Sequence, residues 1–92
     1  MKEYLYYHEE NNRWHMISEL DFNATEQLRL TAFGWVLLTY GNVGILYDFT
    51  DWMKYNDNKN CPVVAVSQLL RDFLISEERQ YEVIKKRKEK LS

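Results

Sequence analysis

The sequence predicts an α+β fold in one domain, residues 1–92: an N-terminal β-hairpin packed on a buried central helix and a long C-terminal helix. Three observations predict it. Two Tyr- and Trp-containing segments flank Asn11-Asn12, an uncharged stretch covers residues 30–47, and apolar residues recur at helical spacing after Pro62. A chain of 92 residues forms one modest core rather than two.

Residues 3–9 and 13–19 are predicted to form the hairpin, with a two-residue turn at Asn11-Asn12. This turn places His8 opposite His15 and Tyr6 opposite Ile17. One face is the more apolar and is expected to be buried; it carries Leu5, Tyr7, Trp14 and Met16. The other face is expected to lie in solvent unless a second helix covers it; it carries Tyr4, Tyr6 and Ile17.

The central helix is expected to begin at Ala24, because Asn23 and Glu26 have the spacing of a capping box. Gly41 is its expected C-terminal cap. The alternative is a second β-hairpin at residues 35–49. Whichever of the two forms, a short helix is expected at residues 51–55. The uncharged stretch contains Gly34 and Gly41, and its apolar part is too short to cross a membrane, so no membrane contact is expected.

The C-terminal helix is predicted from Pro62 onward, because Pro suits the first turn of a helix. Its apolar stripe has helical spacing and consists of Val66, Leu69, Leu70, Phe73 and Leu74. Ser76 either begins a further helix or lies within one long helix.

The composition excludes several classes of protein. A single cysteine, Cys61, excludes a disulfide scaffold, and the N-terminus lacks the apolar run of a secretory signal, so a cytoplasmic location is expected. We find no phosphate-binding loop, no cysteine pair and no nucleophile with an activating partner, so neither an enzyme nor a cofactor is expected. The two histidines leave one alternative, a small metal-binding protein or enzyme that uses His8 and His15.

Aromatic residues make up 15% of the chain, more than a small core requires, and aromatic residues favour protein interfaces. The function predicted first is therefore a non-enzymatic module that docks on another protein or forms a homodimer. The Asn, Lys and Tyr residues that are abundant in the chain are typical of AT-rich genomes. Such a composition suits an accessory or inhibitory protein of a phage or mobile element. The expected contact residues are Tyr4, Tyr6, His8, His15 and Ile17.

A second alternative rests on an uneven distribution of charge. Residues 1–84 contain 7 basic and 13 acidic side chains, whereas residues 85–92 contain 5 basic and 1 acidic. A basic C-terminal helix suits a regulator that binds nucleic acid, although the acidic body opposes it. The basic patch consists of Lys85, Lys86, Arg87, Lys88 and Lys90.

Overall fold

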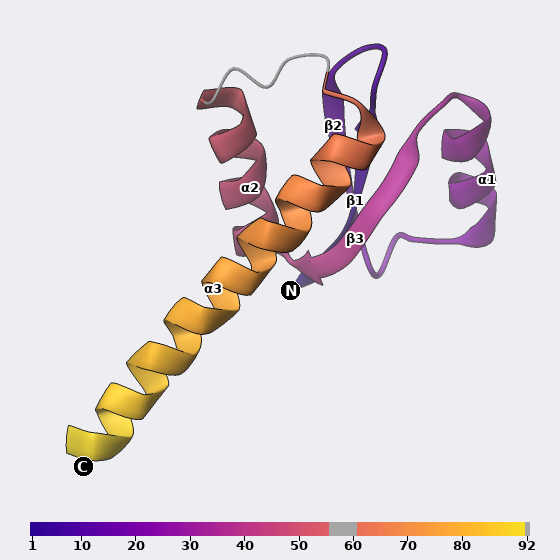
Figure 1. The fold of residues 1–92 in the computed structure, drawn as a ribbon. Helices are drawn as coiled ribbons and strands as arrows, with labels where there is room; N and C mark the ends of the chain where they lie inside the picture. The colour runs from indigo at the N-terminus through magenta and orange to yellow at the C-terminus, as the bar shows by residue number, and fades with distance from the viewer. Residues whose placement is uncertain (56–60, 92) are drawn as a thin grey trace.

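The computed structural model describes the backbone of residues 1–55 and 61–91, and the side chains of residues 1–55 and 61–77. The described chain forms three strands and three helices (Figure 1). In chain order they are β1 (Lys2–His8), β2 (Arg13–Ser18), α1 (Ala24–Ala32), β3 (Val36–Asn42), α2 (Val43–Tyr55) and α3 (Val63–Leu91). The α+β class, the N-terminal hairpin and the long C-terminal helix are thus confirmed.

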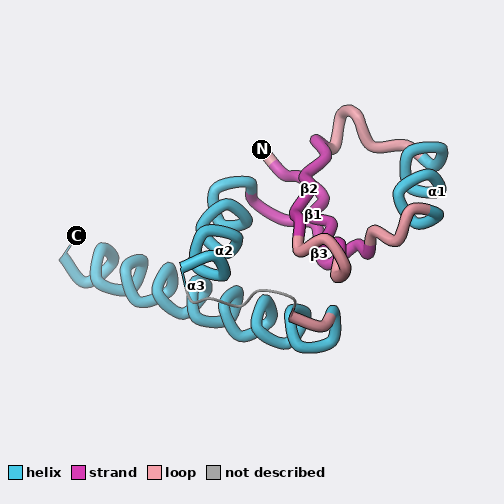
Figure 2. Tube along the Cα trace, turned by 90° about the horizontal axis from the view of Figure 1, so that it is seen from above, coloured by secondary structure: helices cyan, strands magenta, loops and turns pink. Residues whose placement is uncertain are grey.

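The three strands form one antiparallel sheet in the order β2-β1-β3, with β1 in the centre. Helix α1 lies on one face of the sheet, and α2 and α3 lie on the other (Figure 2). We call these the α1 face and the α2/α3 face. Because side chains alternate along a strand, β1 contributes to the core on both faces.

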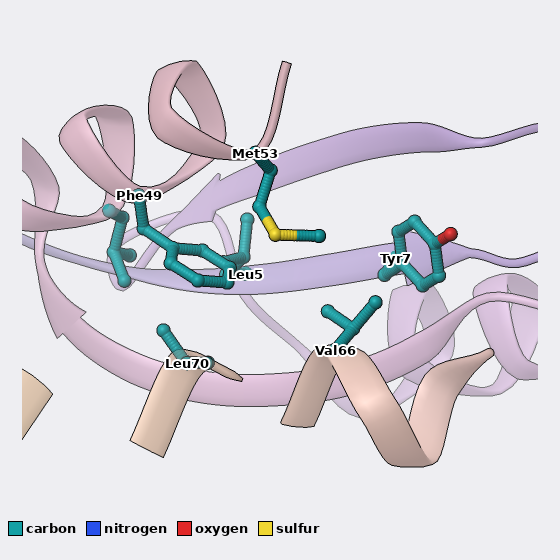
Figure 3. Close-up of a cluster of buried hydrophobic side chains, with 7 residues drawn as sticks. Leu5, Tyr7, Phe49, Met53, Val66 and Leu70 are labelled. Atoms are coloured by element: carbon teal, nitrogen blue, oxygen red, sulfur yellow. The ribbon is translucent and has the colours of Figure 1, made fainter. Parts of the chain in front are cut away.

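The main core lies on the α2/α3 face. Phe49 and Met53 point from α2, and Val66 from α3, toward Leu5 and Tyr7 of β1 (Figure 3). Trp14 and Met16 of β2 pack against the same cluster, as the alternation of the sequence predicted. Full burial of each aliphatic or aromatic side chain contributes about 1.5–3 kcal/mol, so this cluster is the main source of stability.

The hairpin distributes its side chains between the two faces as predicted, but the pairing of its strands differs from the predicted register. Tyr6 pairs with His15 and His8 with Arg13, a slip of two residues from the expected pairing. The turn therefore contains four residues, 9–12, and Asn12 takes the positive φ of 51°. Because side chains alternate with a period of two, this slip exchanges partners without exchanging faces. It also releases Glu9 from the strand pairing expected for it.

The expected central helix ends much earlier than Gly41. Helix α1 begins at Ala24 with Asn23 accepting the Glu26 N–H, as predicted, but its last residue is Ala32. Gly34 has φ of +90°, its N–H donates to Thr31 O, and the Trp35 N–H donates to Leu30 O. This is a Schellman termination with glycine in the left-handed position. The prediction failed because it treated Gly34 as an interior residue.

Residues 36–55 match the alternative hairpin only in part. The first strand of the alternative hairpin is present as β3, whose register against β1 shifts between Leu5 and Tyr6. The second strand of that hairpin is wrong, because one helix, α2, covers Val43–Tyr55. The helix expected at residues 51–55 is present as the last part of α2. Asn42 accepts the Gly44 N–H and caps this helix. The buried residues of α2 have helical spacing: Leu46, Phe49, Thr50 and Met53.

Helix α3 runs through Ser76 as one long helix, which confirms one of the two alternatives given for that residue. The hairpin anchors its first turn. Glu9 accepts the Val63 N–H at 3.1 Å, and the buried Tyr7 hydroxyl donates to Cys61 O at 2.7 Å. A carboxylate at a helix N-terminus also complements the helix dipole. Within residues 1–55 and 61–91, no helix is both long and apolar enough to cross a membrane.

The Gly34→Ala variant should be less stable than wild type by at least about 1–2 kcal/mol, because a left-handed conformation is costly for alanine. A Cβ at this position would also lie 3.0 Å from His8 Nε2. Gly41→Ala is the matched control, since the nearest atom to its added Cβ is 3.9 Å away. Urea unfolding measures both variants, and equal stabilities would contradict this account of the end of α1.

Candidate functional site

The predicted contact residues are less accessible than expected. Tyr6 is 1% exposed, Ile17 is 7% exposed, and both pack against Leu30 of α1. The expectation that this face lies in solvent is therefore wrong, and the alternative, that a helix covers it, is confirmed, because α1 covers it. Tyr4 is half-buried and stacks on Phe22. Among the predicted contact residues, only His15 is exposed.

His8 has a structural role that its sequence position did not reveal. Its side chain is buried, its Nδ1 accepts the Asn11 N–H, and its Nε2 lies 2.8 Å from Phe33 O. With Nδ1 accepting, the ring proton lies on Nε2 and is donated to Phe33. His8 thus ties the hairpin turn to the end of α1.

The predicted register placed the two histidines opposite each other across the strands. In the structure His8 pairs with Arg13 and His15 with Tyr6, so the two are not opposite each other. Both of their rings contact Trp35, at centroid distances of 5.2 Å for His8 and 5.7 Å for His15. Among the residues that the structure describes, no group of three or more His, Cys, Asp or Glu side chains is placed to hold a metal ion. The side chains of the basic patch, residues 85–90, lie outside the described residues.

The most distinctive feature of the described chain is the outer edge of β2. Its inner edge pairs with β1, and no other described strand lies beside it. The Glu19 N–H donates to Lys2 O at the end of this pairing. In an antiparallel ladder every second residue of a strand directs its N–H and C=O groups toward the partner strand. Because Glu19 does so, Ile17 and His15 also direct theirs toward β1. The N–H and C=O groups of Trp14 and Met16 therefore point outward.

This outward direction ends at Ser18. Ser18 O accepts the N–H groups of Asp21 and Phe22, both at 3.0 Å, as the chain turns toward α1. The backbone groups available for a new strand are consequently those of Trp14 and Met16, and the matching segment would be short.

Two grooves flank this edge, one on each face of the sheet. The groove on the α2 side measures about 420 Å³, and the groove on the α1 side about 500 Å³. His15 and Met16 line both. The α2-side groove is further lined by Glu3, Trp14, Tyr47, Asp51 and Lys54. The α1-side groove is further lined by Ile17, Ser18, Asp21, Glu26 and Arg29.

The other edge of the sheet is less suited to pairing. Strand β3 is interrupted by the register shift opposite Leu5 and Tyr6, and such irregularities protect edges from further pairing.

Comparisons with protein-family models, with curated proteins and with solved structures found no match to the chain.

Sequence reasoning assigned Trp14 and Met16 to the buried face and did not identify them as edge residues. Their alternation with polar residues predicts which face they occupy, and the structure confirms it. Whether β2 lies at an edge depends on the pairing of β3 with β1, whose paired residues are 29 to 40 positions apart in sequence. No local signal in residues 13–18 reports that pairing.

On the α1 face, a side-chain hydrogen bond links β3 to the residue that follows β2. The Tyr40 hydroxyl of β3 donates to Glu19, which follows β2, and Lys2 Nζ lies 5.5 Å from the Tyr40 ring centroid. The hydrogen bond to Glu19, with a smaller contribution from burial, raises the pKa of Tyr40 to about 12.

A raised pKa means that folding favours the neutral phenol. We expect this contribution to stability to be complete below about pH 10, the ordinary tyrosine pKa, and to be lost as the pH rises through about 12. The difference in unfolding free energy between wild type and Tyr40→Phe should shrink over that range. An NMR titration in which Tyr40 ionises near pH 10 would contradict the assignment, and Glu19→Gln should lower the Tyr40 pKa toward that value.

Proposed function

We propose that this protein is a non-enzymatic binding module that docks on another protein by adding an extended segment of that protein to the outer edge of β2. The observation that carries the proposal is the outward direction of the Trp14 and Met16 backbone groups between two grooves. In strand addition, main-chain hydrogen bonds provide affinity, and pockets for alternate side chains provide specificity. The β2 edge has both elements.

The rest of the fold supports a rigid edge. Met16 packs against the main core and Ile17 is buried beneath α1, so β2 is held from both faces. A preorganised strand avoids the entropy cost that a mobile segment would incur on binding. Sequestering a segment that the partner needs elsewhere is the way in which such a module would act as an inhibitor.

The first test is a selection of random heptapeptides displayed on phage, with the full chain as bait. We expect wild type to enrich peptides, and the best of them is then measured by fluorescence anisotropy. Met16→Pro should weaken its binding about tenfold or more, since proline removes an outward N–H and projects its ring into the added strand. Met16→Ala is the matched control, because it loses the same side chain and keeps the N–H.

Circular dichroism establishes that both variants fold, and an NMR titration of wild type does not depend on either. The amides of Trp14 and Met16 should shift most when the peptide is added. If no peptide is enriched, or if the shifts gather on β3 instead, the proposed function is wrong.

A further inference from the structure

The charges that line the two grooves indicate what kind of segment the edge accepts. On the α2 side, Glu3 and Asp51 face a single cation, Lys54. On the α1 side, Asp21 and Glu26 face a single cation, Arg29. Arg29 Nη2 lies 2.8 Å from Glu26 Oε2, so this pair is neutralised internally and leaves Asp21 as the excess charge. Each groove therefore has an excess of one negative charge.

Strand geometry links the two grooves to one ligand. Successive side chains of an added strand point to opposite faces of the sheet. A segment paired with Trp14 and Met16 would thus direct one side chain toward the α2-side groove and its neighbour toward the α1-side groove. The sequence pattern that fits is a pair of adjacent residues, each with a cationic end, rather than alternating charge.

We propose that the segment captured by β2 is an extended, basic stretch of a partner protein, with Lys or Arg at two adjacent positions, one for each groove. This inference rests on the proposed function and specifies its ligand. The α2-side groove adds Trp14 and Tyr47, whose rings suit the aliphatic stem and cationic end of such a side chain. The 7 basic against 13 acidic residues of positions 1–84 would also attract a basic partner over a longer range.

The heptapeptide selection tests the inference directly. Enriched peptides should contain adjacent Lys or Arg residues, and the affinity of the best peptide should fall as the salt concentration rises. Asp51→Asn and Asp21→Asn should each weaken it about two- to fivefold, the effect of one partly exposed charge pair. Lys54→Gln should strengthen it by a similar factor, because it removes the opposing cation. Asp48→Asn is the matched control, since Asp48 is exposed on α2 and lines neither groove.

The outcomes separate this inference from the proposed function. If peptides are enriched and Met16→Pro abolishes their binding, but they lack basic residues, strand addition stands and the basic specificity is wrong. The specificity is also wrong if Asp51→Asn and Asp21→Asn bind as Asp48→Asn does. If sedimentation shows that the chain self-associates and that removing residues 85–92 prevents it, the chain's own basic end fills the edge of a second copy. The partner is then not a different protein and the inference fails.

Discussion

The fold depends on the central position of β1. Leu5, Tyr6 and Tyr7 are consecutive residues with exposures of 0%, 1% and 0%, although their side chains point alternately to opposite faces. This burial is possible only because β1 has strands on both sides, α1 on one face and the α2/α3 pair on the other. A two-stranded hairpin alone is marginally stable in water, so the third strand and the helices are required for the hairpin to persist.

The same arrangement determines what remains available for binding. Polar contacts from the hairpin fix the surrounding elements: His8 holds the end of α1, and Glu9 and Tyr7 hold the start of α3. These contacts use side chains from β1 and its turn and leave the outer edge of β2 uncovered by the described chain. The Tyr6 hydroxyl, which is buried beneath α1, has no hydrogen-bond partner among the described residues.

The sequence was informative where a signal is local. The alternation of Leu5 and Tyr7 correctly predicted the face that holds the main core despite a wrong register, and Asn23 located the start of α1. It was uninformative where the outcome depends on distant pairing. Trp35 and Val36 suit a helix or a strand, and β1 decides between them. The edge position of Trp14 and Met16 follows from that decision, so neither the strand order nor the candidate site could be predicted locally.

Amide hydrogen exchange along β2, measured by NMR on the isolated protein at low concentration, tests the central claim most directly. An outward-facing edge predicts an alternating pattern, in which Trp14 and Met16 exchange rapidly while His15 and Ile17 are protected by their bonds to β1. Uniform protection from Arg13 to Ile17 would contradict the account, because it would mean that something in the isolated protein already covers this edge.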